Sequence, residues 1–119
     1  MPPSTLELLR DILREAEFLA AQSAQTTEAE FLHNEVLKHA FVRSLEVIGE
    51  ATKRVSDDAR QQVSELEWRK RAGMRDKLIH DYGEVDYFIV WDVAARKTPN
   101  LIAKLRAVIG AADDSSDSL

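Results

Sequence analysis

Apolar side chains recur at helical spacing along nearly the whole chain, and this periodicity constrains the fold more than any other feature. Leu, Ile and Ala return every three or four residues in the segment 6–19, and a similar stripe runs through 37–52. Glycine and proline number only four and three in 119 residues, and strand-like alternation is hard to find. The pattern predicts an all-α fold, an antiparallel bundle of four to five helices joined by short connections.

Capping patterns mark where the expected helices begin. A Ser or Thr stands three residues before a Glu at Ser4–Glu7, Thr27–Glu30 and Ser64–Glu67. The second of these helices is expected to run unbroken to about Val55, followed by a connection over 56–63 with at most one short helical turn. Asp86 is expected to cap the last helix. Thr98 and Pro99 then either begin a separate continuation or kink one continuous helix.

The composition suits one helical domain, which we place at 1–112, followed by a disordered acidic tail at 113–119. The chain has no cysteine, which fits a reducing cytoplasm. Its longest apolar run, at 87–91, is far shorter than a membrane span, and the early charges near the N-terminus argue against a secretory signal. We therefore expect a cytoplasmic protein without membrane contact, disulfides or a bound cofactor.

The charge of the chain is unevenly distributed. The net charge of −5, from 16 basic and 21 acidic residues, speaks against binding of nucleic acid by the whole surface. One cationic cluster, at 69–77, contains five Lys or Arg and one Asp. Its members Arg71 and Lys77 could be solvent cover on an exposed helix, or they could guide RNA, rather than DNA, or an acidic partner toward the motif that follows.

That motif is the stretch MRDKLIHDYGEVD at 74–86. On an α-helix, Arg75 and Tyr82 are seven residues apart and lie almost on one line, whereas Asp76 and His80 are four apart and share a second line about 100–160° away. Both lines have an ordinary interpretation, because Asp–His pairs are common on helix surfaces and a tyrosine near a helix end often packs its ring. Spacing alone leaves open whether these residues form a site.

The same residue types suit phosphodiester cleavage. A carboxylate that holds one imidazole nitrogen fixes the tautomer, so that the other nitrogen can move a proton. An arginine can bind the phosphate and offset charge in the transition state. The 2′-hydroxyl of RNA is an internal nucleophile, so no metal is required. Since the motif has one His and cleavage needs two proton transfers, a symmetric dimer could supply both.

The motif also stands within an ordered set of sequence blocks. The segment RDKLIHDY, at 75–82, has an Arg, four residues, a His, any residue and a Tyr. The other blocks are RSLEVIGEATKRV at 43–55, Trp68 followed by GMRDKLIHDY, and VDYFIVWDVAARKTPNLIAKL at 85–105. Together they follow one another in order between residues 43 and 105. The set resembles the HepT-type toxins of the HEPN domain superfamily; the short motif alone is weak, whereas the ordered blocks are specific.

This resemblance implies a helical homodimer with ribonuclease activity, the toxin of a type VII-like toxin–antitoxin pair. Carried over by position, Arg75 and His80 are the catalytic residues in a cleft at the dimer interface. Asp76 occupies a functional position where many relatives have Asn, which leaves the proton step of His80 open. The implied antitoxin is an MNT-type nucleotidyltransferase that transfers AMP to Tyr82, and the added phosphate would repel RNA beside Arg75.

Other polar and aromatic residues have less specific interpretations. Arg43, Glu46 and Glu50 share one face of the second helix, as a solvated face or, by the family comparison, as lining of the dimer cleft. We interpret His33 and His39 as structural, and Trp68 and Trp91 as core or interface anchors. A rival function also stays open, that of a non-catalytic helical binding partner of a nucleotidyltransferase.

Overall fold

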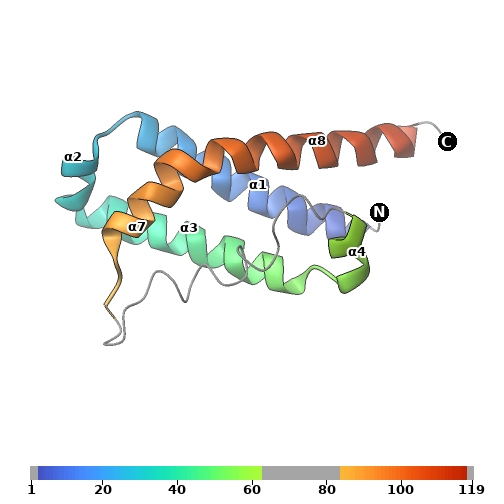
Figure 1. The fold of residues 1–119 in the computed structure, drawn as a ribbon, viewed down its shortest axis with the longest axis horizontal. Helices are drawn as coiled ribbons and strands as arrows, with labels where there is room; N and C mark the ends of the chain where they lie inside the picture. Colours follow the sequence, from blue (N-terminus) through green and yellow to red (C-terminus); the bar gives the residue numbers. More distant parts are fainter. Residues whose placement is uncertain (1–2, 63–83, 118–119) are drawn as a thin grey trace.

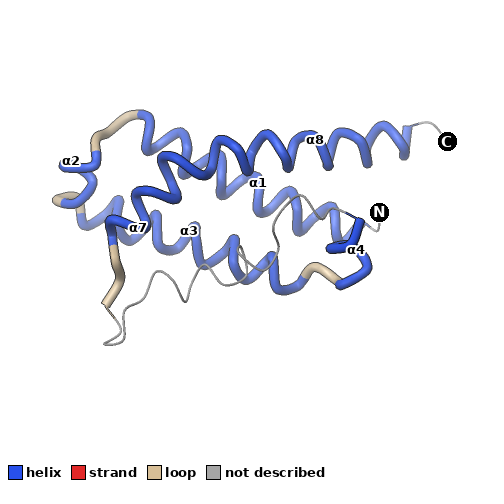
Figure 2. Tube along the Cα trace, in the orientation of Figure 1, coloured by secondary structure: helices blue, strands red, loops and turns tan. Residues whose placement is uncertain are grey.

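The computed structural model describes the backbone of residues 3–62 and 84–117, with side chains for 4–61 and 84–112. Its elements are α1 (Pro3–Ala24), α2 (Glu28–Leu32), α3 (Glu35–Arg54), α4 (Asp57–Gln62), α7 (Tyr87–Asp92), the π-helix η2 (Val93–Lys97) and α8 (Thr98–Asp117). The described ranges contain helices and no strand, so the all-α prediction is confirmed (Figure 2). None of the helices in these ranges is long and apolar enough to cross a membrane.

Helix α1 is the centre of the bundle. It packs against α3 on one side and α8 on the other, and both run antiparallel to it (Figure 1). The helices α2 and α7 close one end, while α4 and the start of α1 lie at the opposite end (Figure 1). The core is formed by the inward stripes of the three long helices: Leu9, Ile12, Ala16, Leu19, Phe41, Leu45, Ile48, Leu101, Ile102 and Leu105. The apolar periodicity of the sequence therefore corresponds to one continuous core.

Aromatic rings fill the end of the bundle where α2 meets α7. The ring of Phe31 lies 4.8 Å from Phe41, 5.4 Å from Trp91 and 6.4 Å from Tyr87, measured between centroids. Such pairs add about 0.5–1.5 kcal/mol each beyond the area they bury. Trp91 is only 7% exposed, which confirms it as a core anchor. The ammonium group of Lys38 covers the Tyr87 ring at 4.3 Å.

The expected long second helix is wrong, because the structure divides it into α2 and α3. Thr27 caps α2 as predicted, accepting a hydrogen bond from the Glu30 N–H at 3.2 Å. The helix then stops before Asn34, whose backbone is extended at φ −110° and ψ 96°. The Asn34 side chain accepts from the Leu37 N–H at 3.0 Å and so caps a new helix. An Asn side chain competes for backbone donors in this way, and its preference for the cap position explains the break.

At the last helix, one of the two alternatives left open by the sequence is wrong. Thr98 does not cap a separate helix, since its backbone is helical, with φ −65° and ψ −35°. The chain is helical from Tyr87 to Asp117, and its axis changes direction between α7 and α8 (Figure 2). The turn before Pro99 is a π-turn, in which the Thr98 N–H donates to Val93 O. A proline ring would meet the carbonyl four residues back in a regular α-helix, and the π-turn accommodates it.

Element ends differ from the expected ones in smaller ways. Helix α1 begins at Pro3, one residue before the expected cap. The connection at 56–63 contains the short helix α4, in line with the short helical turn that the sequence allowed there. Helix α8 continues to Asp117 and so includes most of the segment expected to be a disordered tail. The division of the chain at residue 112 stays a prediction.

Candidate functional site

The predicted catalytic motif lies outside the described residues. Arg75, Asp76, His80 and Tyr82 all fall in the range 63–83, as do Arg71, Lys77 and Trp68. Their roles therefore stay predictions. The structure describes the helices that flank this range on both sides, and the α3 face predicted to line the cleft.

An arginine holds the chain in place just before the motif range. Arg60, on α4, donates from Nε to Val55 O at 3.1 Å and from Nη2 to Thr52 O at 2.9 Å. Both carbonyls belong to the end of α3, and Thr52 is fully buried. Hydrogen bonds from a charged donor stabilise more than neutral ones, so α4 is firmly attached to α3.

A helix cap holds the chain just after the motif range. Asp86 Oδ1 accepts from the Phe88 N–H at 3.0 Å and from the Ile89 N–H at 3.3 Å, which confirms Asp86 as the N-cap of α7. Val90 and Trp91 then bury the inner face of α7. The two flanks of the motif range are thus both anchored, at opposite ends of the bundle (Figure 1).

The three residues predicted to line a dimer cleft lie on the outward face of α3. Arg43 Nη1 is 3.9 Å from Glu46 Oε2, and Glu50 Oε1 is 3.7 Å from Lys53 Nζ. The side chains of Arg43 and Glu50 are 75% and 63% exposed, and Glu46 is 38% exposed. Exposed pairs of this kind add little to stability. In a single chain the solvated-face interpretation is sufficient, and the cleft role stays a prediction.

Two of the three histidines bond to the backbone of their own segments. The Nδ1 atom of His33 lies 2.8 Å from Ala29 O, and that of His39 lies 2.7 Å from Glu35 O. No group of three or more His, Asp or Glu in the described part of the chain is arranged to hold a metal ion. These contacts agree with the structural interpretation of both residues.

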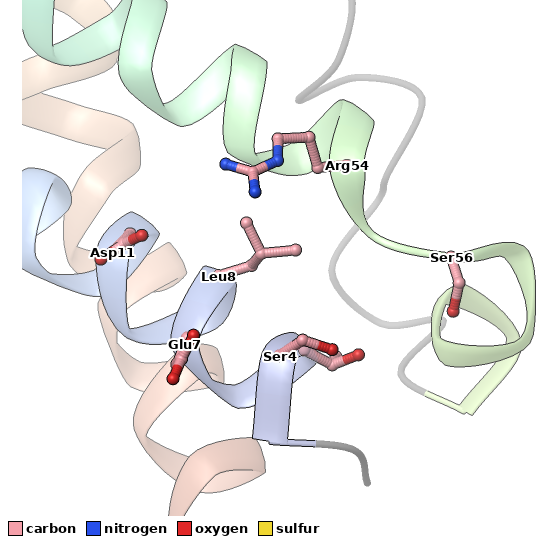
Figure 3. Close-up of a pocket in the computed structure, with 7 residues that line it drawn as sticks. Ser4, Glu7, Leu8, Asp11, Arg54 and Ser56 are labelled. Carbon is pink, nitrogen blue, oxygen red and sulfur yellow. The ribbon is translucent and has the colours of Figure 1, made fainter.

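The described residues also form a pocket that the sequence did not reveal. It has a volume of about 310 Å³ and lies where α1 begins, α3 ends and α4 begins (Figure 3). Its lining consists of Ser4, Thr5, Glu7, Leu8, Asp11, Arg54 and Ser56. These residues come from segments more than 40 positions apart and make no local motif, so no spacing in the sequence could have indicated them.

Comparison with known proteins supplies the identity of the family. Residues 6–108 match the model of a family described as ribonuclease HepT-like. The chain belongs to the HepT-like ribonuclease family. A HepT-like relative from Caldanaerobacter subterraneus subsp. tengcongensis, named as a candidate RNase, is 41% identical over 85% of this chain and 90% of its own.

Further HepT-like relatives come from archaea. One from Methanocaldococcus jannaschii, also named as a candidate RNase, is 39% identical over 85% of this chain and 84% of its own. Another, from Thermococcus cleftensis, is named as a candidate ribonuclease HepT. It is 35% identical over 87% of this chain and 94% of its own. No solved structure matches the chain. The HepT-like resemblance noted in the sequence blocks is confirmed, and the matched range includes both the motif positions and the exposed face of α3.

Proposed function

We propose that this HepT-like protein is a metal-independent endoribonuclease and the toxin of a toxin–antitoxin pair. The observation that carries the proposal is the match to a ribonuclease family over residues 6–108, a range that contains the Arg75, His80 and Tyr82 pattern. The activity is placed in the cytoplasm, in keeping with a chain that has no cysteine.

The proposed reaction uses the 2′-hydroxyl of RNA as nucleophile. One imidazole removes the 2′ proton while the 2′ oxygen attacks the adjacent phosphorus, and a second group protonates the departing 5′ oxygen. The products are a 2′,3′-cyclic phosphate and a 5′-hydroxyl end, so neither water nor a metal ion is consumed in this step. His80 would move protons and Arg75 would stabilise the extra negative charge on the phosphoryl oxygens.

Asp76 is assigned a positioning role. It follows Arg75 and stands four residues before His80, a spacing at which helical side chains meet. A carboxylate there would favour the imidazolium form of His80, because a nearby negative charge raises the pKa of a histidine. The two chains of a symmetric dimer carry the same Asp76, so this effect does not assign the donor and acceptor roles; one imidazolium would donate a proton and one neutral imidazole would accept one.

The site is proposed to be shared by two copies of the chain. Each chain contributes one motif histidine, whereas the reaction transfers two protons. The exposed charged face of α3, with Arg43, Glu46 and Glu50, is available to line the resulting cleft. Arg71 and Lys77 would extend the positive charge along the RNA backbone.

Regulation is proposed to act on Tyr82. An MNT-type nucleotidyltransferase antitoxin would transfer AMP to its hydroxyl and place a phosphate beside Arg75. The chain has only two tyrosines, and the second, Tyr87, lies among Phe31, Lys38 and the rest of the aromatic cluster. Mass spectrometry after co-expression with the neighbouring nucleotidyltransferase should find AMP on Tyr82. Modification of Tyr87 instead would overturn the assignment.

A growth test separates this proposal from the rival function. Expression of the chain alone should arrest growth, and His80→Ala should abolish the arrest. The net charge of −5 and the single motif histidine per chain keep the rival open, a non-catalytic partner of a nucleotidyltransferase. A harmless wild-type protein that still binds the nucleotidyltransferase would support that rival and contradict a toxin.

A further inference from the structure

The pocket between α1, α3 and α4 is separate in sequence from the proposed catalytic motif. Leu8 provides an apolar surface, and the guanidinium of Arg54 and the Leu8 side chain point toward one another (Figure 3). Ser4 and Ser56 flank the side opposite Asp11 in the same view. A volume of about 310 Å³ lies at the lower end of the range for small-ligand sites. The pocket is therefore large enough for one small polar group, and its lining contains apolar, charged and hydroxyl side chains.

One buried hydroxyl in this pocket has no hydrogen-bond partner among the described residues. Thr5 is only 5% exposed, and within the described residues its side chain makes no hydrogen bond. A buried hydroxyl left unpaired costs about 1–3 kcal/mol by mutational measures. Thr5 lines the pocket, so a ligand with a donor or acceptor would satisfy it.

The charged groups of the pocket offer both a donor and an acceptor. Arg54 is exposed and forms no ion pair with any described residue, so its donors are available. Asp11 uses Oδ1 to pair with Arg14, which leaves Oδ2 as an acceptor. Glu7 points away from Arg54 (Figure 3). With two carboxylates in the lining, a free phosphate would be opposed, whereas a ligand that both donates and accepts would be complementary.

The wall formed by α4 is held in place before any ligand arrives. Ser56 Oγ accepts from the Ala59 N–H at 3.3 Å, which leaves the hydroxyl hydrogen of Ser56 able to donate. The hydrogen bonds from Arg60 to Thr52 O and Val55 O fix the turn that carries Ser56. A wall ordered in advance reduces the entropy lost on binding.

We propose that this pocket binds a guanine base of single-stranded RNA. The proposal rests on the proposed ribonuclease function for the kind of ligand, and it names a base preference for that substrate. Guanine accepts hydrogen bonds at O6 and N7, and an arginine such as Arg54 can donate to both atoms at once. It also donates from N1 and N2, and these donors suit the Asp11 carboxylate. Its face packs on Leu8. Adenine lacks the adjacent N1 and N2 donors, and inorganic phosphate has no donor for Asp11.

The proposal can be tested by titrating guanosine, adenosine or inorganic phosphate into the full chain and monitoring the backbone amide signals by NMR. Guanosine should shift the amides of Ser4, Thr5, Leu8 and Ser56 along a saturable curve. Arg54→Gln should weaken guanosine binding by about tenfold or more, as expected for a lost bidentate pair. Asp11→Asn should reduce the preference for guanosine over adenosine. Arg96→Gln is the matched control, because Arg96 is exposed and pairs with Asp92 away from the pocket, and it should leave guanosine binding unchanged.

Two results would overturn the guanine site. One is the absence of saturable shifts with guanosine; the other is equal binding of adenosine or of phosphate alone. The readout does not depend on cleavage, so the two proposals can fail separately. A chain that cuts RNA but does not bind guanosine contradicts only the pocket, and a chain that binds guanosine without cutting RNA contradicts only the nuclease.

Discussion

Thr98 shows how one hydroxyl can replace a backbone donor that proline removes. Pro99 has no N–H, and the π-turn before it leaves the buried carbonyl of Ala94 in need of a donor. Thr98 Oγ1 donates to Ala94 O at 2.6 Å, and Ser23 Oγ, on α1, lies 3.4 Å from the same oxygen. Thr98 is 1% exposed and Ser23 is 8% exposed. The π-turn is thus bonded to α1 as well as to its own helix.

Substitution of Thr98 tests how much this hydroxyl contributes to the free energy of unfolding. Thr98→Val keeps the shape but removes the donor to Ala94 O, and it should lower the free energy of unfolding by about 1–3 kcal/mol. Thr98→Ser keeps the donor and serves as the control, with a smaller loss from the missing methyl group. Urea unfolding measures both. If the valine variant is as stable as the serine variant, the hydrogen bond does not support the π-turn.

At the scale of the elements, the sequence predicted what is locally determined. The caps at Thr27 and Asp86 were correct because each depends on the side chain and the backbone within three residues. The break at Asn34 was missed, since apolar periodicity continues on both sides of it and masks a single capping residue. The continuity at Pro99 could not be decided locally, because the Ser23 hydroxyl near Ala94 O comes from 71 residues away.

The cap at Asn34 can be tested by substitution. Asn34→Ala removes the acceptor for the Leu37 N–H and should destabilise the protein by about 1 kcal/mol, with faster hydrogen exchange in the first turn of α3. Asn34→Asp retains the acceptor and places a negative charge at the helix N-terminus, so it should preserve stability. Equal stability of the alanine and aspartate variants would show that the break between α2 and α3 does not depend on this cap.

At the scale of the whole molecule, the sequence predicted the bundle and the family, and it indicated a candidate motif but not the pocket. The motif at 75–82 could be recognised because its residues are contiguous on one helix-forming segment. The pocket could not, because Thr5, Asp11 and Arg54 come together only when α1 packs against α3. The proposed dimer also depends on the whole molecule, since two complete chains must associate to bring two motif histidines into one cleft.

The proposed dimer can be tested by measuring the mass of the protein in solution. Light scattering after gel filtration should give twice the chain mass of 13.5 kDa. Glu46→Arg reverses a charge on the exposed face of α3 beside Arg43, and it should increase the monomer fraction through repulsion across the cleft. Glu17→Arg, which reverses an exposed charge paired with Arg106, is the control and should leave the dimer intact. A monomeric wild-type chain at micromolar concentration would contradict the shared site.

The most direct test of the account is RNA cleavage by the purified chain in EDTA. Wild-type protein should cut single-stranded RNA and leave 2′,3′-cyclic phosphate ends. His80→Ala should slow cleavage by at least about a hundredfold, the range attributed to a lost general acid or base. His33→Ala is the matched control, because the imidazole of His33 is exposed and lies against the Ala29 carbonyl of its own segment, and this variant should cleave at the wild-type rate. Cleavage that requires added metal, or an unchanged rate in His80→Ala, would contradict the proposed mechanism.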